Sequence, residues 1–61
     1  MDADRMTPKD AQLIRQALDV PYTSWHDVRA LIPQADTDEA RDILRSIESS
    51  KYHTDEYFAS M

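Results

Sequence analysis

Residues 7–19 read TPKDAQLIRQALD, and this stretch carries both a helix start and an apolar face. The Thr7 hydroxyl can accept a hydrogen bond from a first-turn amide, and Pro8 stands where a helix needs no N–H donor. At about 100° per residue, the apolar side chains fall within an arc of about 160°. They are Ala11, Leu13, Ile14, Ala17 and Leu18. Because Pro21 disfavours helical geometry in the residue before it, we predict a helix over 8–19.

A second helix start lies at Ser24, which has an acid three residues further on. The apolar residues that follow share one helix face, and they are Trp25, Val28, Leu31 and Ile32. Pro33 stops the segment, so we predict a helix over 25–32. We expect Trp25 to be the central core residue of the bundle. If its ring points outward instead, Trp25 becomes the leading candidate for a binding hot spot.

A third helix is predicted over 37–50, after a short connection. Asp36 or Thr37 can cap it, and Asp36 with Glu39 would make the better reciprocal cap. The apolar residues of this helix are spaced to face inward, and they are Ala40, Ile43, Leu44 and Ile47.

The segment 51–61 is rich in aromatic side chains and has three interpretations. Thr54 can cap a short fourth helix whose apolar side chains dock onto the bundle. A flexible tail can instead present its rings to a partner, because exposed Tyr and Phe make good interface anchors. A short edge strand is the third alternative. The apolar side chains concerned are Tyr52, Tyr57, Phe58 and Met61.

These elements predict an all-α fold, a small three-helix bundle forming one domain over 1–61 with residues 1–6 frayed. A domain of about 60 residues buries only about 60% of the surface that its unfolded chain exposes, so the core must be thin. The chain has Cys 0 and His 2, which leaves little scope for disulfides or a structural metal. Association with a partner chain or with a second copy therefore gains weight.

The balance of charge is acidic, with 12 acids against 7 bases and a formal net charge of −5. This balance disfavours nonspecific binding to nucleic acid or to an anionic membrane. No apolar run approaches the about 20 residues of a membrane span, and the first residues are acidic where a signal peptide would be basic. We therefore expect a cytoplasmic protein. Imitation of duplex phosphates by the acids is a further alternative, which the moderate charge density makes weak.

Catalytic and cofactor signals are few. Gly 0 means that no glycine-rich loop can cradle a phosphate. His26 and His53 lie in different segments with no ordered third ligand, so surface histidines explain them better than a metal site or an acid–base pair. A deep substrate cleft is hard to build at this size. We expect no enzymatic activity, no cofactor and no metal.

By elimination, the sequence predicts a non-enzymatic regulator or inhibitor that occludes a surface of a larger bacterial or viral protein. The expected partner has an apolar groove with a basic rim, into which aromatic side chains insert while acids match the rim. A homodimer is a further expected form. The candidate protein-binding residues are Tyr22, Tyr52, Tyr57 and Phe58.

The alternative function is that of a dimeric helix-turn-helix DNA-binding regulator. The helices predicted over 25–32 and 37–50 are joined by a brief turn, and Arg41 and Arg45 lie one turn apart on the second. Against this alternative, Asp42 and other acids border the basic stripe, and each would repel a polyanion at close range.

Overall fold

The computed structural model describes residues 6–61, and within that range it contains helices and no strand. Two short 3₁₀ turns, η1 and η2, flank the second α-helix. The predicted fraying of residues 1–6 lies outside the described residues except at Met6, which is exposed and precedes the first helix. The elements are α1 (Pro8–Asp19), η1 (Tyr22–Ser24), α2 (Trp25–Leu31), η2 (Ile32–Gln34) and α3 (Asp38–Ala59).

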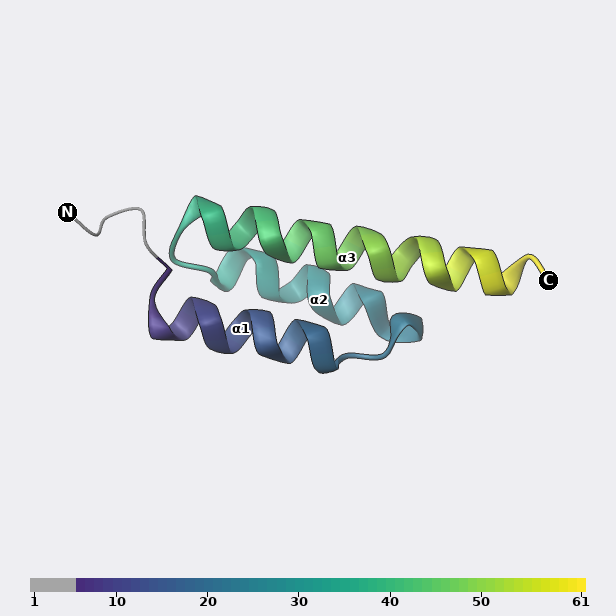
Figure 1. Ribbon diagram of the computed structural model, residues 1–61, viewed down its shortest axis with the longest axis horizontal. Helices are drawn as coiled ribbons and strands as arrows, with labels where there is room; N and C mark the ends of the chain where they lie inside the picture. Colours follow the sequence, from purple (N-terminus) through teal and green to yellow (C-terminus); the bar gives the residue numbers. More distant parts are fainter. Residues whose placement is uncertain (1–5) are drawn as a thin grey trace.

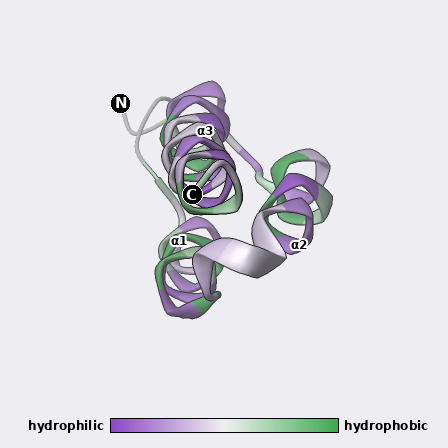
Figure 2. Ribbon diagram, turned by 90° about the vertical axis from the view of Figure 1, so that its right-hand side faces the viewer, coloured by the Kyte–Doolittle hydropathy of each residue, from purple (hydrophilic) through white to green (hydrophobic). Residues whose placement is uncertain are grey.

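The three α-helices form a bundle in which α2 runs antiparallel to both α1 and α3 (Figure 1). Viewed along the long axis, the three helices occupy the corners of a triangle (Figure 2). The principal extents are 48 × 14 × 14 Å, because the carboxyl end of α3 projects past the other two helices. This arrangement confirms the predicted all-α three-helix bundle. It also shows α2 and α3 as an antiparallel hairpin, whereas the helices of a helix-turn-helix cross at about 90–120°.

The start of α1 follows the sequence signals closely. The Thr7 hydroxyl accepts from the Asp10 amide at 3.1 Å, and the Asp10 carboxylate accepts from the Thr7 amide at 3.4 Å. Pro8 occupies the first helical position, where its missing N–H costs nothing. At the other end Val20 is extended before Pro21. The predicted bounds 8–19 are confirmed.

The start of α2 differs from the predicted cap. Ser24 stands at the N-cap position but its side chain makes no capping hydrogen bond. Instead its amide donates to the Pro21 carbonyl at 2.9 Å, which closes the η1 turn that leads into the helix. The end of α2 falls at Leu31, one residue before the predicted end, and Pro33 lies in the η2 turn.

The start of α3 is capped by Thr37, so the preference for Asp36 with Glu39 was wrong. The Thr37 hydroxyl accepts from the Ala40 amide at 3.3 Å and donates to the Asp10 carboxylate at 2.8 Å. The Asp36 carboxylate turns instead toward α1, where it accepts from the Thr7 hydroxyl at 3.0 Å. Thr37 is favoured because its hydroxyl bonds at once to its own helix and to α1.

The carboxyl end of α3 lies at Ala59, nine residues beyond the predicted end at Ser50. The chain has no glycine, and its last proline is Pro33, so no backbone signal stops the helix at Ser50. Thr54 does not cap a fourth helix, because its hydroxyl donates back to the Ser50 carbonyl at 2.9 Å within the continuous helix. The separate fourth helix and the edge strand were therefore wrong, because residues 51–59 continue α3.

The core is as thin as the length suggests. The largest fully buried apolar side chains are Leu44 and Val28, and small side chains fill much of the remaining space. Four expected core residues lie outside it: Ala11 and Leu18 are exposed, Leu18 by 61%, and Trp25 and Ile43 are only half-buried. The buried apolar residues within the described range are Leu13, Ala17, Val28, Ala35, Ala40 and Leu44.

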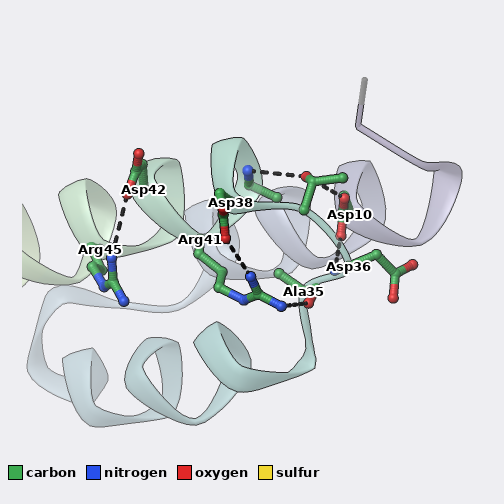
Figure 3. Close-up of polar contacts among 9 residues, drawn as sticks. Asp10, Ala35, Asp36, Asp38, Arg41, Asp42 and Arg45 are labelled. Carbon is green, nitrogen blue, oxygen red and sulfur yellow. Dashed lines mark hydrogen bonds and ion pairs between the residues drawn. The ribbon is translucent and has the colours of Figure 1, made fainter. Parts of the chain in front are cut away.

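One buried carboxylate, that of Asp10, joins the amino ends of α1 and α3 (Figure 3). It accepts from the Asp36 amide at 2.7 Å, the Thr37 hydroxyl at 2.8 Å and the Thr7 amide at 3.4 Å. Both helices begin at this end of the bundle (Figure 1), so the carboxylate offsets two positive helix-dipole ends. Burial acts to raise the pKa of Asp10, but the hydrogen bonds from Asp36, Thr37 and Thr7 outweigh it and hold the pKa below 3.8.

Candidate functional site

Three of the four candidate protein-binding residues lie together near the projecting end of α3. The Phe58 ring centroid is 5.5 Å from that of Tyr22 and 5.4 Å from that of Tyr57. Tyr57 is 65% exposed, Phe58 50% and Tyr22 37%. We call Tyr22, Tyr57 and Phe58 the ring cluster. It is a group of exposed aromatic rings at one end of the bundle.

The ring cluster depends on η1, because that turn brings Tyr22 to α3. The Ser24 amide to Pro21 carbonyl bond closes η1, and Tyr22 is its first residue. Phe58 lies on the same helix face as the core residue Leu44, two heptads further along α3. Past the end of α1, that face meets Tyr22 instead of another helix. The ring cluster is thus the continuation of the core into solvent.

The fourth candidate, Tyr52, belongs to a separate contact between α2 and α3. Its ring packs edge-on against Trp25, with centroids 4.9 Å apart. The Trp25 indole N–H donates to the Asp55 carboxylate at 3.2 Å, and the Arg29 guanidinium lies 4.9 Å from the indole centroid. Trp25 is half-buried, so the expectation of a central core residue was wrong. These contacts hold the carboxyl half of α3 against α2.

Acidic side chains stand beside the rings. Asp55 and Glu56 lie on α3 directly before Tyr57, and Glu56 accepts from the Tyr52 hydroxyl at 2.9 Å. That hydrogen bond and the negative charge of Glu56 raise the pKa of Tyr52 above 10.0, with partial burial adding to the shift and Arg29 opposing it. The carboxyl end of α3 adds the negative end of its dipole. The electrostatic environment of the ring cluster is therefore negative.

A second surface feature is a groove of about 330 Å³ between α1 and α3. Exposed Leu18 forms its α1 side. At one end the Lys51 ammonium donates to the Leu18 carbonyl at 3.4 Å, close to the negative end of the α1 dipole. The α3 side of the groove is lined by Ile43, Ser46, Ile47, Ser50 and Lys51.

The two arginines of the DNA-binding alternative are paired with acids of their own helix (Figure 3). Arg41 contacts Asp38 at 2.6 Å and also donates to the Ala35 carbonyl at 3.1 Å, in the turn before α3. Arg45 contacts Asp42 at 3.3 Å. Arg41 therefore stabilises the turn and the first part of α3. DNA binding through these residues stays a prediction, and the antiparallel packing of α2 and α3 lends it no support.

The histidines His26 and His53 each contact a neighbouring ring on the surface. Within residues 6–61, no three His, Asp or Glu side chains are grouped so that they could hold a metal ion. In the same range, no helix combines the length and the apolar character needed to cross a membrane.

The sequence did not indicate two of these features. The contact between Tyr22 and Phe58 joins residues far apart in the chain, and the groove exists because Leu18 and Ile43 lie at the edge of the packed face. The one local signal for the groove was the wide apolar arc of residues 8–19, which is broader than a single contact stripe requires.

Comparison with protein-family models, with curated proteins and with solved structures finds no match to this chain.

Proposed function

We propose that the chain is a non-enzymatic protein-binding module that regulates or inhibits a larger protein by occluding part of its surface. The observation that carries this proposal is the ring cluster, in which the Phe58 ring centroid lies 5.5 Å from that of Tyr22 and 5.4 Å from that of Tyr57 while all three side chains remain exposed. Aromatic anchors of this kind supply much of the binding energy of protein interfaces. Because the ring cluster lies near the projecting end of α3, the bundle does not obstruct a partner's approach.

The partner fitted to this surface has an apolar groove with a basic rim. Phe58 and Tyr57 would enter the groove, and Asp55 and Glu56 would face the rim. Complementary charge of this kind raises the rate of encounter and fixes orientation, while the desolvated rings supply affinity. Regulation follows from occlusion, since a groove filled by these rings is closed to the partner's other ligands.

The test compares capture of proteins from a bacterial lysate by the tagged wild-type chain and by the variant Tyr57→Ala with Phe58→Ala. We expect one stoichiometric protein, retained after nuclease treatment, to be lost from the double variant. Both rings are half or more exposed, so helicity and melting temperature should change little. Met6→Ala is the matched control, because Met6 is an exposed apolar residue at the other end of the bundle.

Two results would count against the proposal. Unchanged capture by the double variant would show that the ring cluster is not the binding surface. Loss of helicity in the double variant would show that the rings belong to the core. Retained proteins that vanish with nuclease would favour the DNA-binding alternative, with Arg41 and Arg45 as the next residues to change.

A further inference from the structure

A second stripe, of uncharged side chains, runs along α3 about 60° from Phe58 and shares Tyr57 with the ring cluster. Successive members of this stripe are four, three, four, three and four residues apart, the spacing of a and d positions in a coiled coil. The members within α3 fall in an arc of about 80°, and Met61 follows the last turn. We call this stripe the seam, and it comprises Ile43, Ile47, Ser50, Thr54, Tyr57 and Met61.

The seam joins the groove to the projecting end of α3. Its first half, Ile43 to Ser50, lines the groove beside Leu18. Its second half contains Tyr57 and Met61, which are largely exposed beyond the end of α1. One molecule therefore carries a groove and a protruding apolar end on the same helix. We propose that the seam pairs with the seam of a second copy, antiparallel, so that each copy's protruding end fills the other's groove.

The order of side-chain sizes along the seam supports a second copy of the chain as the molecule that fills the groove. Antiparallel pairing about a two-fold axis near residue 52 places Ile47 against Tyr57 of the second copy, and Ser50 against Thr54. The large side chains thus meet large ones toward the ends, and the small ones meet at the centre, where the helices approach most closely. Exposed Leu18 stands beside Ile47 and adds a second wall for the incoming Tyr57. An interface of this kind is self-complementary and closes as a dimer.

The distribution of charge also permits pairing of two acidic copies. None of the six seam residues is charged, although the whole chain has a formal net charge of −5. Between Ile43 and Met61 the acids of α3 lie outside the seam arc, and they are Glu48, Asp55 and Glu56. Like-charge repulsion therefore acts away from the contact. The pairing covers Tyr57 and leaves Tyr22 and Phe58 open, so a second copy and the partner of the proposed function would compete for Tyr57.

The expected dimer is weak. The seam is about 27 Å long and a helix is about 10 Å wide, so its area is below the about 800 Å² per partner of a standard interface. Sedimentation equilibrium from about 1 μM to about 1 mM chain should show a reversible dimer with micromolar affinity. A wild-type chain that stays monomeric over this range would overturn the proposal.

The discriminating variant is Ile43→Glu, with Ser49→Glu as its control for added charge. Ile43 is half-buried and is not among the side chains packed against the core, so the fold should tolerate the change. Ser49 is exposed and lies off the seam. We expect Ile43→Glu to raise the dissociation constant of the dimer at least about tenfold and Ser49→Glu to leave it within about twofold. Equal weakening by both variants would reject the seam.

Cysteine cross-linking tests the register independently, since the chain has no cysteine of its own. Chains with Ser50→Cys and chains with Thr54→Cys should form a mixed disulfide when combined. Neither variant alone should form a disulfide with a second copy of itself. The two-fold axis places the Cα atoms of the two copies of the same residue about 10 Å apart, and a disulfide spans at most about 7 Å between Cα atoms. Strong cross-linking of each variant with itself would indicate parallel pairing and overturn the proposal.

The dimer proposal and the proposed function can each be refuted without the other. Phe58 lies off the seam, so Phe58→Ala should retain the wild-type dimer while it weakens capture of the partner. A dimer that survives Ile43→Glu but is lost in Phe58→Ala would place the self-contact at the ring cluster and reject the seam. Loss of partner capture has no bearing on the sedimentation result.

Discussion

Asp10 is the residue on which the amino-terminal end of the bundle depends. Its carboxylate is buried and accepts hydrogen bonds from two backbone amides and one hydroxyl, which belong to the residues just before α1 and just before α3. A buried charge is costly unless it is matched by donors, and here the donors are positioned by Thr7, Asp36 and Thr37. The ionised form of Asp10 therefore stabilises the fold.

The first prediction concerns the pH dependence of stability. Because the folded pKa of Asp10 is lowered below 3.8, its contribution to stability is present above about pH 3.8 and is lost as the pH falls through the folded pKa. Asp10→Asn should be less stable than wild type at neutral pH, and the difference should shrink in acid. Urea unfolding at about pH 7 and about pH 2.5 measures both free energies. A difference that stays constant would contradict the assignment.

The second prediction concerns the cap of α3. Thr37→Ala removes the acceptor for the Ala40 amide and a donor to Asp10. We expect the free energy of unfolding to fall by about 1 kcal/mol or more, since loss of a threonine cap alone costs about that much. Thr23→Ala is the control, because Thr23 is exposed in η1 and should change stability by less than about 0.5 kcal/mol. Equal effects of the two substitutions in urea unfolding would argue against Thr37 as the cap.

At the scale of the elements, the sequence predicted where helices begin better than where the last one ends. The bounds of α1 follow from Thr7, Pro8 and Pro21, which act on the backbone within a few residues. The length of α3 depends instead on contacts far apart in sequence, above all the Trp25 indole with Asp55. The aromatic composition of 51–61 suggested a change of structure, but the backbone has no residue there that interrupts a helix.

The third prediction tests the continuity of α3 beyond Ser50. The test compares the variants His53→Ala and His53→Gly. His53 is exposed, so the two variants differ mainly in helix propensity. If residue 53 lies inside a helix, the Gly variant should be less stable than the Ala variant by about 1 kcal/mol, measured by urea unfolding. Equal stabilities would indicate that this segment is not helical in solution.

At the scale of the whole molecule, the shape is set by a thin core and one long helix. The core contains few large apolar side chains, chiefly Leu13, Val28 and Leu44, in agreement with the thin core expected from the length of the chain. The candidate site was predictable only in part. The aromatic residues could be named from the sequence, but the meeting of Tyr22 with Phe58 and the separate position of Tyr52 depend on how η1 packs against α3.

The shared carboxylate of Asp10 also bears on how the chain folds. Its bonds to Asp36 and Thr37 span 26 and 27 residues, so they close a loop that contains α1 and α2 almost entirely. The capping bonds within each helix start are local, but the bonds that join Asp10 to Asp36 and Thr37 form only when that loop has closed, and the entropy of closure is lost once for both of them. Fraying at the start of α1 and at the start of α3 is therefore coupled. The bundle gains at this end a cooperativity that two independent caps would not give.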